Sequence, residues 1–301
     1  LAMEFRINDS PVAGREGKFV TSRQVRARLD RAARSDVALQ VLEGELPDAW
    51  EVRGRGILHL GILIETLRRE GYEFAVGRPR VLIRDGESGP EEPIENVSVE
   101  VPPEDAGRVI EMLGRRRGEM LQMTTRGDLA FLEFEAPSRG LIGLRTRLLS
   151  ATRGEAVLTS VFARYDAHRG PVPARKSGSQ ISSETGRVTA YALNALTDRG
   201  PFFVDAGEEV YEGQVVGEHR REEDVIVNPA RRKHLTNIRA AGSDEKAEYP
   251  PPVRKSVEEC LEFLADDELL EVTPESLRLR KRLLKEADRR KDARRRRNLD
   301  G

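Results

Sequence analysis

Cysteine, histidine, tryptophan and long apolar runs are scarce in this chain of 301 residues. Its single cysteine, Cys260, excludes an internal disulfide and favours a reducing compartment, so we expect a cytoplasmic protein. No apolar run approaches the roughly 20 residues that cross a bilayer, and no signal peptide is recognisable, so no membrane partner is expected. The four histidines are scattered, without the Cys/His/Asp spacing that gathers a metal ion, so no metal site is expected.

Catalytic patterns are missing as well. Residues 14–18 (Gly-Arg-Glu-Gly-Lys) resemble a phosphate-binding P-loop, but Val12 stands where its first glycine should be, and Phe19 follows the lysine where a hydroxyl should hold Mg²⁺. We therefore expect a basic loop there. Residues 182–185 and 266–268 contain potential nucleophiles or acid/base pairs without convincing partners, so cap or surface roles are favoured. The sequence predicts no catalytic residue and no cofactor for this chain.

The formal net charge of −1 conceals a strong segregation of charge. Residues 278–297 contain twelve Lys/Arg against three Asp/Glu, whereas residues 255–276 contain eight Asp/Glu against Lys255 alone. The basic tail has no assigned role. The acidic stretch 256–271 is a candidate docking face for a protein partner.

Residues 218–239 form a second cation-rich stretch, which contains six Lys/Arg against four Asp/Glu. Guanidinium forks and amide side chains suit phosphates, 2′-hydroxyls and unpaired bases, although composition alone is equally compatible with a solvated loop. The candidate RNA contacts here are Arg220, Arg221, Asn228, Arg231, Arg232, Lys233, His234, Asn237 and Arg239. Secondary candidates, which could equally complement a helix dipole or line a basic loop, are Arg115, Arg116, Arg117, Arg15 and Lys18.

Hydrophobic periodicity predicts the same order of elements twice. The first copy has strands at 3–7, 37–42, 50–52 and 74–83, with helices from Ser22 and over 57–70. A polar linker at 85–93 precedes the second copy, with strands at 97–101, 120–123, 130–134 and 156–163 and helices at 104–114 and 140–153. The order βαββαβ is the ferredoxin-like split unit. The predicted class is α+β: two tandem ferredoxin-like domains, then a β-rich C-terminal domain with helical ends (256–265 and 282–297).

Several motifs resemble one family. Residues 55–72, which contain Ile-Leu-His-Leu, are similar to the Gly-Glu-Leu-His-Leu helix of the elongation factor G superfamily, with Ile57 in place of the usual glutamate. Further matches narrow the resemblance to the BipA/TypA family of ribosome-binding translational GTPases; they lie at residues 8–22, 137–143, 183–186, 228–229 and 235–240. The resemblance covers nearly the whole chain.

The resemblance implies that the chain is the C-terminal half of such a GTPase. Residues 1–10 would end a β-barrel domain, 11–88 would be domain III, 89–170 domain V, and 171–301 the family-specific C-terminal domain. The GTPase domain, with its GTP and Mg²⁺, would lie outside this chain, so the chain itself would not be catalytic.

The resemblance also implies partners: the ribosome with its rRNA (50S and 70S particles) and A-site tRNA, approached by a loop that maps onto roughly 218–240. The family is associated with large-subunit assembly and with stress and cold adaptation. Our leading hypothesis is therefore a ribosome- and RNA-binding module. The alternative is a protein-interaction module that docks through the acidic stretch 256–271.

Overall fold

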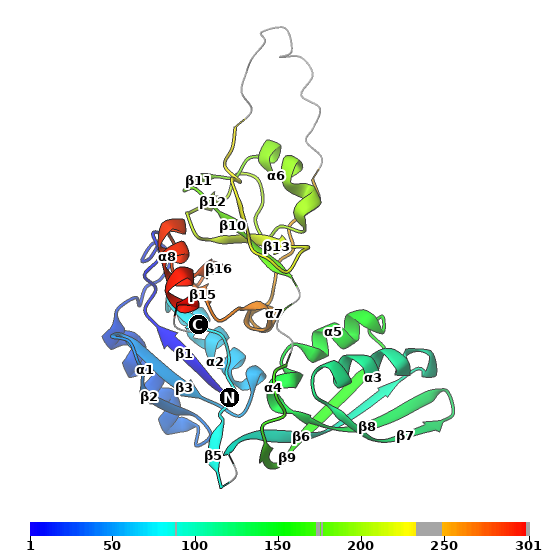
Figure 1. Cartoon of the computed structure of the whole chain (residues 1–301). Coiled ribbons are helices and arrows are strands. Elements are labelled where there is room, and N and C mark those ends of the chain that lie inside the picture. Colours follow the sequence, from blue (N-terminus) through cyan, green and yellow to red (C-terminus); the bar gives the residue numbers. More distant parts are fainter. Residues whose placement is uncertain (88, 173–174, 176, 233–248, 299–301) are drawn as a thin grey trace.

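The computed structural model describes every residue except 88, 173–174, 176, 233–248 and 299–301. Three parts are distinguishable in Figure 1: a first α/β unit, a second α/β unit beside it, and a small β part that contains α6. Among the described residues, no helix has the length and apolar character that a membrane crossing requires.

The first unit has the predicted order of elements. These are β1 (Ala2–Arg6), α1 (Ser22–Ser35), β2 (Gln40–Glu43), β3 (Ala49–Arg53), α2 (Ile57–Arg69) and β4 (Phe74–Gly77). The strands lie in the order β4-β1-β3-β2, all antiparallel, which is the ferredoxin-like arrangement. Apolar side chains on one face of this sheet, such as Phe5 and Val52, pack against one face of each helix.

Local sequence explains where the two helices begin and end. Thr21, one residue before the predicted start, caps α1 and forms a capping box with Gln24. In α2 the residues at helical spacing, Leu60, Ile64 and Leu67 among them, are fully buried. Gly71 follows α2 with φ +94°, a left-handed conformation that favours glycine, as the sequence predicts.

A hairpin from the far end of the chain extends this first sheet. It consists of β15 (Glu268–Val272) and β16 (Leu277–Lys281), and β15 pairs antiparallel with β4, so that Leu270 lies opposite Val76. The result is one six-stranded sheet, β16-β15-β4-β1-β3-β2. The preceding helix α7 (Val257–Phe263) packs beside α2, and Leu261, Leu270 and Leu279 belong to the same core as Phe5.

Two of the predicted domain boundaries change as a result. The family resemblance implies that residues 1–10 end a preceding barrel, but β1 pairs with β3 and β4 inside the first sheet, where the periodicity predicts a strand over 3–7. The resemblance also implies that 171–301 form one domain, whereas 257–281 complete the core of the first unit. The physical reason is the edge of β4, which would expose unpaired N–H and C=O groups without β15.

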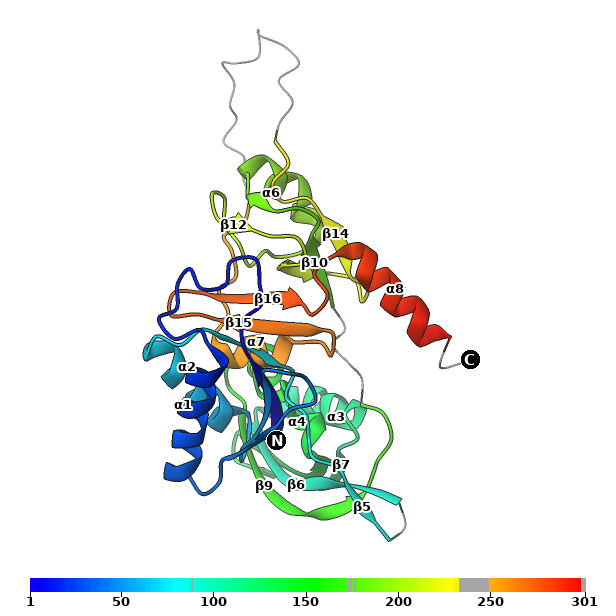
Figure 2. The same cartoon turned by 90° about the vertical axis from the view of Figure 1, so that its left-hand side faces the viewer.

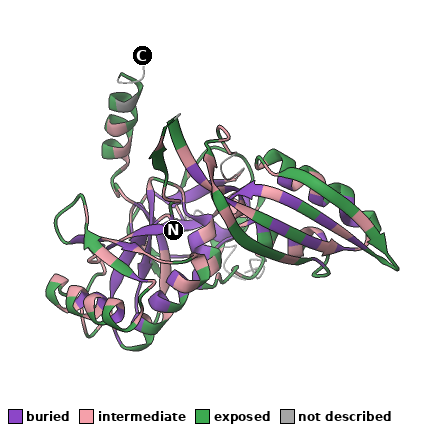
Figure 3. Ribbon diagram, turned by 90° about the horizontal axis from the view of Figure 1, so that it is seen from below, coloured by how far each residue is buried: buried purple, intermediate pink, exposed green. Residues whose placement is uncertain are grey.

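The second unit repeats the arrangement. Its elements are β5 (Arg84–Gly86), β6 (Gly89–Val101), α3 (Ala106–Arg115), β7 (Glu119–Arg126), β8 (Leu129–Pro137), α4 (Ser138–Leu141), α5 (Leu144–Ala151) and β9 (Val157–Ala167). The main strands lie in the order β9-β6-β8-β7, again ferredoxin-like. Figure 3 shows buried and exposed residues alternating along these strands, because α3 and α5 cover one face of the sheet.

The small β part lies between the second unit and the hairpin in the sequence. It contains β10 (Gly178–Ser182), β11 (Gly186–Arg187), α6 (Ala190–Leu196), β12 (Glu209–Val210), β13 (Val215–His219) and β14 (Val225–Val227). A three-stranded sheet, β13-β10-β14, encloses a small apolar core with Phe202 and Val216. After β16, the chain ends in α8 (Glu286–Arg297), which leaves the body of the molecule (Figure 2). The predicted β-rich region with helical ends is thus present, but its two helices are separated: α7 packs on the first unit, and α8 leaves the body of the molecule.

The shared sheet makes a testable prediction about stability. Substituting Leu270→Ala, in the late hairpin, should lower the free energy of unfolding by about 2–5 kcal/mol, because it removes a fully buried side chain. Since Leu270 packs in the core of the first unit, the amides of β1 and β4 should also exchange faster with solvent. Urea unfolding and hydrogen exchange measure the two effects. Ile226→Ala, at a partly exposed position of β14, serves as control; unchanged exchange in β1 and β4 of the Leu270 variant would contradict the shared core.

Candidate nucleic-acid interface

The turn between β13 and β14 presents Arg220 and Arg221 to solvent. Both side chains are exposed, and neither forms an ion pair with a described residue. The backbone of the turn is held on both sides: Arg220 N–H donates to the carbonyl of Arg199 (2.9 Å), and the carbonyl of Arg221 accepts from Gly178 N–H (2.6 Å). Gly178 allows this approach, because a Cβ there would lie 2.1 Å from the carbonyl oxygen of Glu223. The arginines therefore project from a fixed turn.

Asp224 ties the same turn to the six-stranded sheet. Its carboxylate lies 2.5 Å from Lys281 Nζ on β16 and accepts from Ser179 N–H on β10 (2.7 Å). Lys281 also contacts Glu268 (3.1 Å), which in turn binds Arg175 (3.1 Å). We call these five residues the polar junction. It joins the small β part to the late hairpin and sets the position of Arg220 and Arg221.

Two charges of the polar junction are almost completely removed from solvent. Burial alone would raise the pKa of the Glu268 carboxyl, but the charges of Lys281 and Arg175 outweigh burial and hold that pKa below its ordinary value. Burial would likewise lower the pKa of Lys281, but Glu268, Asp267 and Asp224 together raise it. Both groups are therefore charged at neutral pH, and each depends on the other.

Arg231 and Arg232 lie beyond the other end of β14, so they are not adjacent to Arg220 and Arg221. Their side chains are exposed and form no ion pair within the part of the chain that the structure describes. The backbone leading to them is fixed at the start of α6, where Thr189 Oγ1 donates to the carbonyl of Arg231 (2.6 Å). Asn228 Oδ1 accepts from Ala230 N–H (3.0 Å), so this amide oxygen shapes a turn. The structure thus holds two separate arginine pairs.

The remaining residues proposed in the stretch 218–239 lie outside the described residues. They are Lys233, His234, Asn237 and Arg239. They follow directly on Arg232 in the sequence, in the segment drawn as a grey trace in Figure 1.

The secondary candidates have mostly structural surroundings. Arg116 donates to the carbonyls of Gly140 (2.6 Å) and Ile142 (2.8 Å), and burial lowers its pKa to about 10, so it holds α4 and does not face outward. Arg117 donates to the carbonyl of Pro171 (3.1 Å). Arg115 is exposed and lies 2.5 Å from Glu111, one helical turn away. These three residues belong to the second unit, away from the small β part (Figure 1).

Residues 14–18, which resemble a P-loop, already bind a carboxylate of this chain. Glu73 is buried and accepts from the N–H groups of Gly14 (2.7 Å) and Gly17 (2.9 Å) and from Asn8 Nδ2 (2.8 Å). Backbone amides that would surround a phosphate in a true P-loop are thus occupied here. Of the two cations, Arg15 pairs with Glu209 (3.3 Å) and Lys18 is exposed. The expected basic loop is present.

The acidic stretch 256–271 does not form an acidic surface. Glu268 and Glu271 are completely buried; Glu271 binds Arg278 (2.9 Å) and accepts from Tyr211 (2.7 Å). Asp267 binds Lys281 (2.9 Å). Others of its carboxylates cap α7 or pair with Arg78. Two of these carboxylates are therefore used inside the molecule, while others, such as Asp266, remain at the surface with a cationic partner.

The first part of the basic tail is buried in the same way. It forms β16, where Arg278 binds Glu16 and Glu271 and Arg280 binds Asp9. Arg282, the residue after β16, binds Glu4 (2.8 Å). The exposed remainder is α8. One exposed arginine that the sequence did not single out, Arg199, lies directly beside Arg220. Its place beside Arg220 is a property of the fold, because the two residues lie 21 positions apart in the sequence.

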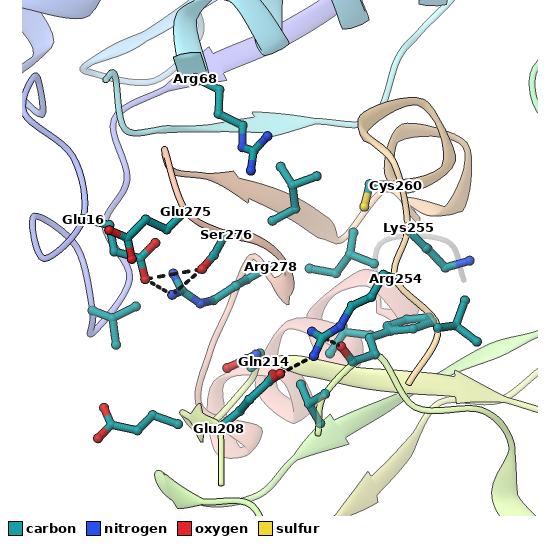
Figure 4. Close-up of a pocket in the computed structure, with 18 of the residues that line it drawn as sticks. Glu16, Arg68, Glu208, Gln214, Arg254, Lys255, Cys260, Glu275, Ser276 and Arg278 are labelled. Atoms are coloured by element: carbon teal, nitrogen blue, oxygen red, sulfur yellow. Dashed lines mark hydrogen bonds and ion pairs between the residues drawn. The ribbon is translucent and has the colours of Figure 1, made fainter. Parts of the chain in front are cut away.

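A cavity of about 700 Å³ lies between the first unit, the late hairpin and the small β part. Figure 4 shows charged side chains around it, joined in pairs: Arg278 with Glu16, and Arg254 with Glu208. Because carboxylates accompany these arginines, the cavity offers little unopposed positive charge for an anion. Among the described residues, no group of His, Cys, Asp and Glu side chains is arranged to hold a metal ion.

Comparison with known proteins finds two family descriptions on consecutive parts of the chain. Residues 90–176 match the elongation factor G C-terminus, and residues 177–286 match the TypA/BipA C-terminal domain. Among the similar curated proteins is the large ribosomal subunit assembly factor BipA of Bacillus subtilis, 46% identical over 295 residues, which are 97% of this chain and 48% of that protein.

The proteins of the same description from Escherichia coli K12 and Haemophilus influenzae are each 47% identical over 293 residues, with the same coverage of 97% and 48%. The chain therefore spans about half the length of the curated relatives it matches.

The polar junction predicts a specific dependence of stability on pH. Because the pKa of Glu268 is depressed in the folded state, its contribution to stability is present above the ordinary value of 4.5 and is lost as pH falls below it. Glu268→Gln should lower stability at pH 7 by about 3–5 kcal/mol, because it leaves Lys281 buried with fewer counter-charges. The variant should also lose less stability between pH 5 and pH 3 than the parent, as followed by urea unfolding at each pH.

Glu222→Gln, in the same turn but exposed, is the matched control and should leave both quantities nearly unchanged. Equal acid sensitivity of the parent and the Glu268 variant would show that the junction does not carry the pH dependence.

Proposed function

The chain carries the C-terminal domains of the BipA/TypA family, and on that premise we propose that it is the ribosome- and RNA-binding portion of a large-subunit assembly factor. Its partners on this proposal are rRNA of 50S and 70S particles and the A-site tRNA, in the cytoplasm. The full-length protein would hydrolyse GTP through a domain outside this chain, which would bind GTP and Mg²⁺. A role in stress and cold adaptation belongs to the same proposal.

One observation carries the proposal: the exposed pair Arg231 and Arg232 has no carboxylate partner among the described residues. Guanidinium groups bind phosphate oxygens through two parallel N–H donors, and they remain charged at any physiological pH. Because the backbone before Arg231 is fixed at α6, these donors keep a defined place at the base of the segment 233–240. The RNA contacts proposed there, Lys233, His234, Asn237 and Arg239, would continue the same cationic surface.

The two ferredoxin-like units serve as a rigid support on this proposal. The shared six-stranded sheet and the polar junction link the small β part to the first unit, so a contact made by Arg231 is transmitted to a stiff body. Of the secondary candidates, Arg15, Lys18, Arg115 and Arg117 remain available as weaker RNA contacts. Arg116 is excluded from the proposal because its donors bind backbone carbonyls.

The alternative of an acidic docking module has less support. Glu268 and Glu271 of the stretch 256–271 are buried, and Asp266 and Asp267 are paired with cations of this chain, so the stretch offers little unopposed negative charge. No further observation favours a protein partner at that place.

The proposal is tested with the double variant Arg231→Ala/Arg232→Ala. Binding to purified large ribosomal subunits should weaken. The slope of log K against log salt concentration should become shallower by about 1.5, because each lost phosphate contact contributes roughly 0.7–0.9 to that slope. Co-sedimentation over a series of salt concentrations measures both quantities.

The matched control is Arg31→Ala/Arg34→Ala, which removes the same charge from exposed positions on α1 in the first unit. The control should bind like the parent chain. Identical affinity and salt slope for the parent and the Arg231/Arg232 variant would refute the assignment of these residues.

A further inference from the structure

The helix α8 is the most cationic element of the chain. It contains seven Arg/Lys and three Asp/Glu among its twelve residues, and its last five residues are one alanine and four arginines. Nearly all described side chains between Arg290 and Arg297 are exposed. Figure 3 shows the helix standing away from the rest of the molecule.

The first turn of α8 is held by the body. Glu286 N–H donates to Glu212 Oε1 (3.3 Å), and Arg289 donates to the carbonyls of Leu283 (2.9 Å) and Leu284. Gly213 permits the close approach, because a Cβ there would lie 2.6 Å from Leu284 Cα. The base of the helix is therefore fixed while its distal half is free to meet a partner.

Three arginines of the distal half have no ion-pair partner among the described residues. Near the base, Arg290 binds Glu286, and Lys291 lies 3.7 Å from Asp288. Further along, Arg294, Arg295 and Arg297 are exposed and form no ion pair with a described residue. Four arginines at the end of a helix interact well with its dipole, but they repel one another. An external polyanion would relieve that repulsion.

The composition of α8 restricts the kind of partner. Its only apolar residues are Ala287 and Ala293, so it has no apolar stripe with which to enter a protein groove or the interface of a membrane. The helix must then bind its partner through charge, and such binding does not require one fixed orientation of the partner. A helix of twelve residues is about 18 Å long, which lets several guanidinium groups reach successive phosphates of one nucleic-acid strand.

The base of α8 lies close to the turn that carries Arg220 and Arg221. Asp224 of that turn binds Lys281 and is near enough to act on the charge of Arg289 in the first turn of α8. The exposed Arg199 adjoins the same turn. This cationic surface, formed by α8, Arg199, Arg220 and Arg221, is separate from Arg231 and Arg232 at the far end of β14.

We infer that α8 and the adjacent turn form a second RNA-backbone site, which binds phosphates of a helical RNA independently of base sequence. The inference rests on the proposed RNA-binding function, and it adds a second contact at a different place on the molecule. Two separated sites would fix the orientation of the chain on a large RNA, which a single site could not do.

The test uses the triple variant Arg294→Gln/Arg295→Gln/Arg297→Gln of the 301-residue chain, with a fluorescein-labelled 20-base-pair RNA duplex and with purified large ribosomal subunits. Affinity for the duplex should fall on the order of tenfold at low salt, and the salt slope should become shallower by about two. The corresponding triple lysine variant should retain most of the affinity, because lysine also binds phosphate as a point charge. Arg23→Gln/Arg31→Gln/Arg34→Gln, on exposed positions of α1, is the matched control and should bind like the parent.

The Arg231→Ala/Arg232→Ala variant is measured in parallel to separate the two hypotheses. If that variant binds weakly while the α8 glutamine variant binds like the parent, the α8 site is refuted and the proposed function stands. If only the α8 variant loses affinity, the α8 site is supported and the assignment of Arg231 and Arg232 fails. If both variants bind like the parent, the α8 site and the assignment of Arg231 and Arg232 are both refuted. If the α8 variant and the α1 control lose affinity equally, the loss reflects net charge alone and the α8 site is refuted.

Discussion

The pairing of β15 with β4 is the interaction on which the rest of the structure depends. It joins residues almost 200 positions apart in the chain and turns a four-stranded sheet into one of six strands. β15 is buried on both faces: Leu270 and Val272 enter the core of the first unit, and Glu271 on the opposite face receives Tyr211 from the small β part. Together with β16, this strand carries the contacts of Glu268 and Lys281 that place the turn of Arg220 and Arg221.

The polar junction fixes the orientation of the small β part relative to the late hairpin. Apolar packing is tolerant of small rotations, whereas the contacts of Lys281 with Asp224 and Glu268 require particular atoms to meet. Burying these charges costs free energy that the ion pairs offset only when all partners are present. The same contacts fix the turn of Arg220 and Arg221 and the base of α8. The polar junction and the candidate RNA surface therefore meet at the same turn: Asp224 points inward to Lys281, whereas Arg220 and Arg221 are exposed.

The fold divides the cations of the chain into two groups. Those of β16 bind carboxylates of the first unit and of the late hairpin: Arg280 binds Asp9, Arg278 binds Glu16 and Glu271, and Lys281 binds Asp267 and Glu268. Those of α8 and of the turns around β14 remain outside. A net charge of −1 thus coexists with locally positive surfaces, because much of the negative charge is used in the interior.

The sequence alone determined the two βαββαβ units, since the spacing of residues such as Leu60, Ile64 and Leu67 and the stop at Gly71 are local features that propensity and periodicity report. It also determined that the stretch around Arg231 is cationic. Only the tertiary structure decided that Arg278 and Arg280 belong to a strand, that Arg116 faces inward, that Glu73 fills the loop resembling a P-loop, and that Arg199 joins Arg220. The reason is physical: charge and periodicity are properties of neighbours in the chain, whereas pairing partners and burial depend on contacts between segments that the sequence keeps far apart.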